Sequence, residues 1–387
     1  MPPLLYLDTA RLGQMTPAAK DAQLDFVRLS AEEPSSLYFE QFLRDGFSAW
    51  SDYYQGRFAG LRTWTGVAGL KHSIRRLAGA PDGWQVLLAS RSLSLVQLAS
   101  SCMFRVCRNV LATDLSWPTY EREIEAKARL TSNHITTVPL RDGILNRGWT
   151  VNDVASYLAA AFTEHQCDGL FLPAVDHLGI RLPVRDIVQR IERRSELRFC
   201  FIDAAQAFCQ VPLDDCLTVA DFIVAGSHKW MGAYLPTGIG LFGQRRSREM
   251  IERRVRPSGN DSRPDDPLLH FTEQLDAGQL DGHSETANLT SLFACAGAAA
   301  DNLRPRARKP LPILNSCLDM LRRPPNGWKL VQPVWEMRSR IALLKRGRKH
   351  SRHVNPESIR LAWLHAGFAV SAYGDGTVRL SFPQNLS

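Results

Sequence analysis

The stretch that most constrains this chain runs from Phe199 to Gly232, where two short apolar segments each lead into polar side chains. The segments Phe199–Ile202 and Asp221–Ala225 are brief, rich in β-branched and aromatic residues and bounded by polar residues, which is typical of buried strands. In an open α/β sheet, ligands bind beyond the carboxyl ends of the strands. We therefore expect the groups that follow these strands, Asp203 and Lys229, to face one pocket.

An acid and a lysine in one pocket have a specific chemical use. Lysine forms a Schiff base with an aldehyde, and a carboxylate can keep a pyridine nitrogen protonated so that the ring accepts electrons. This is the pair that an enzyme dependent on pyridoxal phosphate (PLP) requires. For an isolated pair, a helix-capping Asp203 and a solvated surface Lys229 would be the better explanation, so the decision depends on the residues around them.

Two motifs surround the pair: IDAAQAF at Ile202–Phe208 and GSHKWMGAYLPTGIGLFG at Gly226–Gly243. They resemble the class V aminotransferase family of fold-type I PLP enzymes, whose members include cysteine desulfurases, kynureninase and isopenicillin N epimerase. The resemblance implies an α/β fold with a large, doubly wound, mostly parallel sheet and a small C-terminal α/β domain. It places an N-terminal arm at 1–22, the large PLP-binding domain at 23–285 and the small domain at 286–387.

The resemblance also implies roles around the cofactor. Lys229 carries the PLP aldehyde as a Schiff base and moves protons, and Asp203 pairs with the pyridinium nitrogen. Gln206 bonds the phenolic oxygen, and His228 touches the phosphate. Ser227 is offset by one position from the phosphate-binding serine of the family, with Gly226 in its place, and is included as a cofactor residue.

Two earlier segments match cofactor-binding parts of the family. The strand expected at Trp84–Ala89 leads into a helix, whose N-terminal N–H groups favour an anion such as phosphate. Arg91 and Ser92 stand where the family has glycine and threonine: Ser92 can donate a hydroxyl, and Arg91 can add charge or reach for a substrate group. After the strand Asn109–Thr113, Trp117 matches the aromatic residue that stacks on the PLP ring, unless it is a core tryptophan.

Other matches concern the substrate and a second subunit. Arg379, in VRLSFP, matches the arginine that grips the substrate α-carboxylate as a planar, bidentate fork. Thr286 aligns with a turn whose hydroxyl reaches the phosphate of the neighbouring subunit, which implies a homodimer. His177 either faces the pocket or lies in a loop without contacts, and both interpretations stay open.

The YLDTARLG segment at Tyr6–Gly13 resembles a family loop near the substrate, but Thr9 and Arg11 depart from its pattern and receive no role.

Helices are expected at Ser36–Trp50 and Gly56–Gly79. A polar stretch, Arg245–Pro267, is expected to form a mobile loop over the active site. A helix beginning at Thr16 and Pro17, and further alternating strands and helices, favour a parallel sheet.

The reaction is less constrained than the cofactor. We expect an aminotransferase acting on an α-amino acid, with a lyase (C–S or C–C β-elimination) as the alternative and an epimerase after it. A persulfide-forming desulfurase is disfavoured because residues 340–378 contain no cysteine, whereas desulfurases carry a nucleophilic cysteine just before the carboxylate arginine. A non-catalytic descendant is disfavoured because the chain retains five matching residues together: Asp203, Gln206, His228, Lys229 and Arg379.

Composition sets the remaining limits. The 387 residues allow one large and one smaller domain, and 44% hydrophobic and 22% charged residues are ordinary for a globular protein. No apolar run approaches the ~20 residues of a membrane span, and the N-terminus lacks a signal-peptide pattern, so we expect a cytoplasmic protein without membrane partners. The net charge of +8 includes one concentrated run, Lys345–His353, which we interpret as a charged turn rather than a nucleic-acid site. Eight scattered cysteines without a CxxC pair favour reduced thiols, with no zinc and no disulfide framework.

Overall fold

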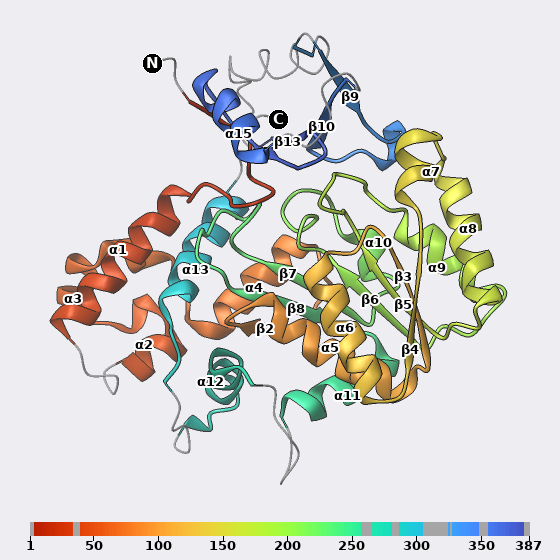
Figure 1. The fold of residues 1–387 in the computed structure, drawn as a ribbon. Coiled ribbons are helices and arrows are strands. Elements are labelled where there is room, and N and C mark those ends of the chain that lie inside the picture. Colours follow the sequence, from red (N-terminus) through yellow and green to blue (C-terminus); the bar gives the residue numbers. More distant parts are fainter. Residues whose placement is uncertain are drawn as a thin grey trace.

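The computed structural model describes residues 4–33, 39–256, 265–280, 286–304, 324–325, 327–347 and 355–382. Within these ranges, a seven-stranded sheet forms the centre of the molecule (Figure 1). Its strands are β2 (Gln85–Ala89), β3 (Asn109–Thr113), β4 (His134–Val138), β5 (Gly169–Pro173), β6 (Phe199–Asp203), β7 (Phe222–Gly226) and β8 (Gly238–Phe242). Their order in space is β2-β8-β7-β6-β5-β3-β4.

The strand directions confirm the expected mostly parallel sheet. Only β8 among these seven strands runs antiparallel to its neighbours, β2 on one side and β7 on the other. The other pairs, from β7 through β6 and β5 to β3 and β4, are parallel. The carboxyl ends of the six parallel-running strands therefore lie at one edge of the sheet.

Helices cover both faces of the sheet, because successive side chains of each strand point to opposite sides. In β6, Phe199 and Phe201 pack in one apolar core, and Cys200 and Ile202 pack in the other. The first core includes residues of α5 (Ser92–Val106), α6 (Pro118–Leu130) and α11 (Arg245–Val255). The second includes residues of α1 (Pro17–Glu32), α4 (Gly66–Ala78), α8 (Val151–Glu164), α9 (Val184–Glu192) and α13 (Thr290–Leu303). Two short helices, α7 (Arg141–Asn146) and α10 (Asp214–Leu217), lie between these elements in sequence.

The N-terminal helices differ from the sequence prediction in their breaks. The predicted helix Gly56–Gly79 is divided into three: α3 (Asp52–Arg57), a short 3-10 helix (Ala59–Thr63) and α4. The break before α4 coincides with Gly66, whose φ of +79° an L-residue rarely adopts. The predicted helix Ser36–Trp50 is represented by α2 (Phe39–Asp45) and a second 3-10 helix (Phe47–Ala49), and its first residues lie outside the described ranges.

The apolar residues of this region belong to the core. Leu61, Trp64, Val67, Leu70 and Ile74 are all buried. They join the same core as α13, whose Phe293 stacks on Phe26 of α1 with ring centroids 4.1 Å apart. Helix α13 packs with the large-domain helices α1 and α4. Its packing favours a small domain that starts later than residue 286. The domain limits stay a prediction.

The small domain contains an antiparallel sheet of β9 (Trp328–Val331), β10 (Ile341–Arg346), β12 (Ser371–Ala372) and β13 (Thr377–Ser381), with helix α15 (Pro356–His365) beside it (Figure 1). The chain begins here too, because β1 (Leu5–Tyr6) pairs parallel with β11 (Phe368–Ala369). A bridge between Asp8 and Ser381 continues this contact. The N-terminal segment is thus part of the small domain before α1 begins.

The prediction of a polar loop over residues 245–267 is wrong for its first half. The first half forms α11 (Arg245–Val255), because Ile251 and Val255 provide a buried apolar face that the loop interpretation overlooked. Residues 257–264 lie outside the described ranges, and α12 (Pro267–Asp276) follows them. Among the described residues, no helix is long and apolar enough to cross a membrane.

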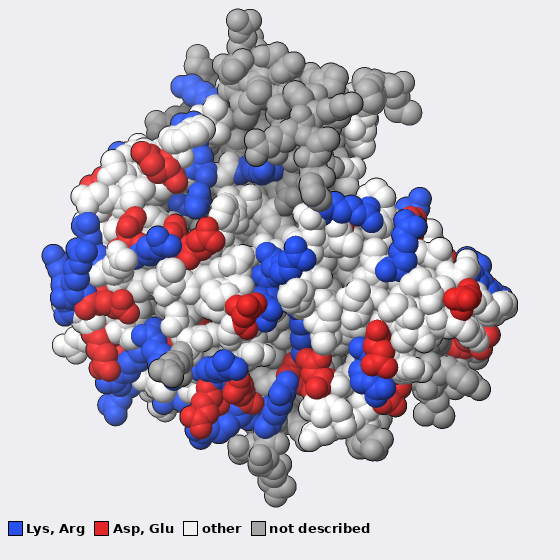
Figure 2. All heavy atoms as spheres, turned by 180° about the vertical axis from the view of Figure 1, so that it is seen from behind, with Lys and Arg blue, Asp and Glu red and all other residues white. Residues whose placement is uncertain are grey.

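The polar surface and the thiols give less information about function. On the face in Figure 2, lysine and arginine side chains are interspersed with aspartate and glutamate, so the excess of positive charge does not gather there in one patch. All seven described cysteines are free, and six of them are buried. Cys317 and most of the basic run after Lys345 lie outside the described ranges.

Candidate active site

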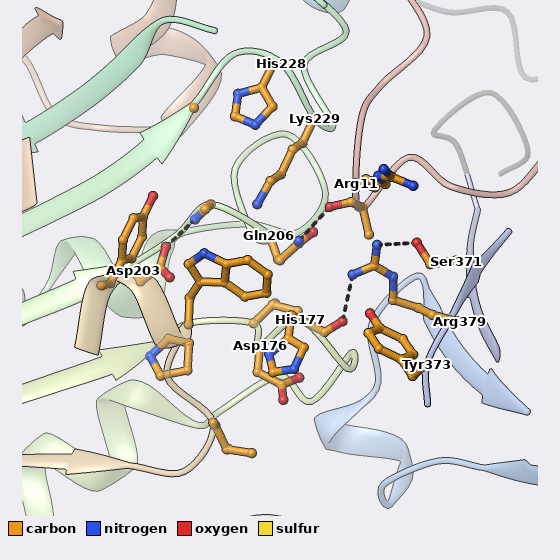
Figure 3. A pocket seen from close by; sticks show the side chains of 18 of the residues that line it. Arg11, Asp176, His177, Asp203, Gln206, His228, Lys229, Ser371, Tyr373 and Arg379 are labelled. Atoms are coloured by element: carbon orange, nitrogen blue, oxygen red, sulfur yellow. Dashed lines mark hydrogen bonds between the residues drawn. The ribbon is translucent and has the colours of Figure 1, made fainter. Parts of the chain in front are cut away.

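A cavity of about 920 Å³ opens at the carboxyl edge of the parallel strands, between the two domains. Residues that follow β3, β5, β6 and β7 line it from the large domain, and residues of α15, β12 and β13 line it from the small domain. This is the place where open α/β sheets bind ligands. The sequence prediction that Asp203 and Lys229 face one pocket agrees with this geometry, and Figure 3 shows both side chains at the cavity.

Burial shifts the pKa of both Asp203 and Lys229. Asp203 is 6% exposed, and burial raises its pKa to about 6, against the hydrogen bond from the Ala205 N–H and the positive charge of Lys229. Burial lowers the pKa of Lys229 to about 8, and Asp203 opposes this shift while Arg379 adds to it. A lysine with a pKa near 8 is partly neutral at physiological pH, which is the state that attacks an aldehyde or accepts a proton.

The candidate ring-stacking residue lies at the cavity with its ring accessible. Trp117 lines the cavity and is 44% exposed, so it is not the core tryptophan of the alternative interpretation. Its ring contacts His177 edge-on, with centroids 5.5 Å apart. Ala205 lines the same cavity.

Gln206 also lines the cavity, but its amide already forms two hydrogen bonds within the protein. Its nitrogen donates to the Ala10 carbonyl at 2.8 Å, and its oxygen accepts from the Trp230 indole N–H at 2.8 Å. One N–H of the amide remains for a ligand, since an amide nitrogen carries two hydrogens. The predicted contact with a phenolic oxygen stays a prediction.

Two residues predicted to bind the cofactor phosphate, Ser92 and His228, line the cavity. Ser92 is the first residue of α5 and lines the cavity, where its hydroxyl accepts a hydrogen bond of 2.6 Å from Tyr120. His228 lines the cavity too, and its buried Nδ1 has no hydrogen-bond partner among the described residues. Gly238 of β8 permits the close approach of α5, because a Cβ there would lie 2.5 Å from the backbone of Arg91.

Three predicted site residues are not brought to this cavity. The Ser227 hydroxyl is directed at the β7–β8 connection instead, donating to the Leu235 carbonyl and accepting from the Thr237 N–H, each at 2.9 Å. Arg91 precedes α5 and is exposed outside the cavity lining. Thr286 is exposed, and its predicted contact with a neighbouring subunit stays a prediction.

Arg379 lies in the cavity on the small-domain side and is 5% exposed (Figure 3). Its guanidinium donates to the His177 carbonyl at 3.2 Å and to the Ser371 hydroxyl at 3.1 Å. It also pairs with Asp8 at 3.3 Å, and the Ser371 hydroxyl donates to the same carboxylate at 2.6 Å. Its buried Nε has no hydrogen-bond partner among the described residues, so the fork is held in place while retaining donors for a ligand.

The structure also brings His177 and Asp176 to the cavity. The sequence left the place of His177 open and gave Asp176 no role. His177 faces the cavity, which decides between its two interpretations, and burial lowers its pKa to about 4. Asp176 is 1% exposed, and burial raises its pKa to about 7 although its Oδ1 accepts the N–H groups of Leu178 and Ile180. Its Oδ2 is buried without a partner in the described part of the chain. The signal in the sequence was an acid directly after a buried strand, as for Asp203.

The loop after β1 packs directly on the lysine. Gly13 donates its N–H to the His228 carbonyl at 2.8 Å, and a Cβ on Gly13 would lie 1.8 Å from the Lys229 carbonyl oxygen. The Ala10 N–H donates to the Ser381 hydroxyl at 2.9 Å. Together with the Gln206 bond, these contacts hold the loop between the two domains.

Comparison with known proteins agrees with this architecture. Residues 170–263 match the family model described as aminotransferase class-V. The expected resemblance to class V aminotransferases is confirmed. No curated protein sequence matches this chain.

Solved structures of similar fold cover almost the whole chain. A cystine C-S lyase, C-DES, aligns at 14% identity with a TM-score of 0.68, covering 99% of this chain and 93% of that one. A phosphoserine aminotransferase from Cytophaga hutchinsonii aligns at 13% identity with a TM-score of 0.66, covering 100% and 95%. The cysteine desulfurase CsdA from Escherichia coli aligns at 14% identity with a TM-score of 0.69, covering 99% and 90%. At these identities the likeness shows the fold, which is that of the fold-type I PLP-dependent enzymes.

The residues at the cavity fit PLP. An acid and a lysine face it from adjacent strands, and an accessible indole ring offers a stacking surface. An unpartnered buried imidazole nitrogen and a helix N-terminus lie where an anion is expected. Among the described residues, no group of histidine, cysteine and acidic side chains could hold a metal ion.

Proposed function

We propose that this protein is a PLP-dependent enzyme that acts on an α-amino acid, with Lys229 as the residue that attaches the cofactor, and that its reaction is a transamination. The observation that carries the proposal is the single cavity faced by Asp203, Lys229 and Arg379 from two domains. These three groups correspond to the cofactor nitrogen, the cofactor aldehyde and the substrate carboxylate. The similar folds of a phosphoserine aminotransferase and a ureidoglycine-glyoxylate aminotransferase support the class.

Each residue has a defined task in this proposal. Asp203 would hold the pyridine nitrogen, Trp117 would cover the ring and exclude water, and Ser92 and His228 would bind the phosphate. When bound, PLP withdraws electrons from the α-carbon of an amino acid and makes its proton acidic. Lys229 then holds and moves that proton, because its pKa near 8 keeps a useful fraction neutral.

Arg379 orients the substrate. Its fork donates to a carboxylate from the small domain while the amino group lies near Lys229 of the large domain, so the Cα–H bond is positioned for proton transfer. Asp8 and Ser371 hold the guanidinium in this direction.

The cofactor assignment is tested by reduction with borohydride. The purified protein should be yellow, and the reduced cofactor should be found on the peptide that contains Lys229. Lys229→Ala should lose the covalent label, whereas Lys20→Ala, which removes an exposed lysine of α1, should keep it. A label that persists on another lysine in Lys229→Ala would contradict the assignment.

A lyase is the second candidate, because of Asp176. Asp176 lines the cavity, and with its pKa raised to about 7 the carboxyl is partly protonated near neutral pH, so it could supply a proton to a leaving group. The similar fold of a cystine C-S lyase supports the same alternative. Incubation with candidate amino acids separates the two: ammonia released without a keto acid indicates a lyase, and amino exchange that requires a keto acid indicates a transaminase.

We also propose that the protein is a homodimer with composite sites, because Thr286 aligns with a family residue that reaches the neighbouring subunit and its side chain is exposed. Sedimentation should show a dimer at micromolar concentration. Mixing inactive Lys229→Ala protein with an inactive Thr286→Ala variant should restore part of the activity, because one of the two sites in a mixed dimer would be intact. A stable, active monomer would contradict this proposal.

A further inference from the structure

Arg11 is the arginine of the cavity lining that has no acidic partner among the described residues. Among the lining residues, Arg379 pairs with Asp8, and Arg360 pairs with Glu357. Asp203 and Lys229 are the pair assigned to the cofactor. Arg11 lines the same cavity and has no ion pair or side-chain hydrogen bond in the part of the chain that the structure describes.

The backbone on both sides of Arg11 is firmly held. Before it, Ala10 is bonded through its carbonyl to Gln206 and through its N–H to Ser381. After it, Gly13 is bonded to the His228 carbonyl. The Arg11 N–H itself donates to the Asp8 carbonyl at 2.9 Å. A guanidinium on so restrained a loop loses little backbone freedom when it binds a ligand.

Arg11 lies on the Arg379 side of the cavity rather than on the Asp203 side (Figure 3). Figure 3 shows it on the same side of the cavity as Arg379 and Ser371, opposite Asp203. Its charge acts on Glu357, whose pKa is lowered mainly by the Arg360 hydrogen bond and to a smaller degree by Arg360 and Arg11 charges. Glu357 already accepts two bonds from Arg360, of which the shorter is 2.5 Å, and among the described residues it forms no ion pair with Arg11.

From this arrangement we infer that Arg11 determines substrate specificity by binding a second anionic group on the substrate, in addition to the α-carboxylate at Arg379. The substrate class is then an amino acid with an anionic side chain, a carboxylate, phosphate or sulfonate. An arginine fork recognises each of these planar or tetrahedral oxyanions. The inference rests on the proposed function, because it takes Arg379 as the α-carboxylate site.

The test measures binding of ligands that have no amino group and therefore do not react. Calorimetry on the PLP-loaded protein compares butyrate with succinate, glutarate and 3-phosphonopropionate. The wild type should bind the best dianion about tenfold more tightly than butyrate, the gain of one partly exposed charge-assisted contact. Which dianion binds best distinguishes a carboxylate from a phosphate-like side chain.

Variants separate a specific contact from general attraction by a positively charged protein. Arg11→Gln should lose the preference for dianions and keep the affinity for butyrate, and Arg11→Lys should recover part of the preference. Arg62→Gln removes the same charge from an exposed position outside the cavity and should change neither affinity. A wild type without preference for dianions, or a preference that persists in Arg11→Gln, would overturn the inference while leaving the proposed function intact. If Arg379→Lys binds butyrate as well as the wild type does, the α-carboxylate site itself fails, and both proposals fall.

Discussion

Replacing Asp176 by asparagine should remove a pH dependence from the stability of the cofactor-free protein. Burial raises the pKa of this carboxyl to about 7 in the folded state, from an ordinary value of 3.8. An acid whose pKa is higher in the folded state than in the unfolded state stabilises the fold fully below the unfolded pKa. This contribution to the free energy of unfolding is lost as the pH rises to the folded pKa. Asparagine keeps the oxygen that accepts the Leu178 and Ile180 N–H groups but does not ionise.

The magnitude follows from the linkage slope of about 1.4 kcal/mol per pH unit. From about pH 5.5 to the folded pKa near 7, the wild type should lose about 2 kcal/mol of unfolding free energy through Asp176. Urea unfolding at about pH 5.5 and about pH 8 measures this, and Asp176→Asn should gain about 2 kcal/mol relative to the wild type between the two. Asp82→Asn, at a fully exposed side chain, is the control and should follow the wild type at both values. Parallel curves for Asp176→Asn and the wild type would refute the reasoning, since they would mean that the carboxyl ionises normally when folded.

Three other changes test the proposed site. Asp203→Ala should still attach PLP at Lys229 but lose turnover on the order of 10²-fold, because one charge-assisted bond in a closed site is lost; near-normal single-turnover rates would assign this task to another acid. Arg379→Lys should bind PLP normally and weaken carboxylate substrates by roughly 1.5–3 kcal/mol, because a point charge does not replace a bidentate fork; an equal loss for amines without a carboxylate would make Arg379 structural. Gly13→Ala should slow PLP attachment, read from cofactor absorbance, because the new methyl meets the Lys229 carbonyl at 1.8 Å; Gly83→Ala has no atom within 4 Å and should not, and equal rates in both would show that the loop yields freely.

Much of this site could be predicted from local sequence, because each residue follows a short buried strand. Asp203 ends β6, Lys229 comes after β7 and Trp117 comes after β3, so parallel pairing alone brings them to one edge. The boundaries of these strands were predicted within two residues, since brief apolar runs bounded by polar residues admit few alternatives. Arg379 reached the cavity from a different domain, and only the family resemblance predicted that.

The remainder depends on contacts between distant parts of the chain. Ser227 was assigned to the cofactor by its place beside His228, yet its hydroxyl is used by the turn before β8, a choice that the register of that turn decides. The raised pKa of Asp176 depends on its burial in the folded chain, which no local pattern reports. Arg11 gave no signal beyond a departure from the family pattern, because its importance depends on which neighbouring charges are already paired.

The short segment from Leu7 to Gly13 connects the recognition of substrate to the attachment of cofactor. At one end, the Leu7 carbonyl accepts the Ser381 N–H at 2.8 Å, and Asp8 holds Arg379. At the other end, Gly13 lies against the backbone of Lys229. The arginine and the lysine belong to different domains, so their separation is set by a segment only a few residues long with anchors at both ends. A movement of the small domain that tightens Arg379 on a carboxylate would therefore act on this segment and, through Gly13, on the backbone of Lys229, and Arg11 lies between these two anchors.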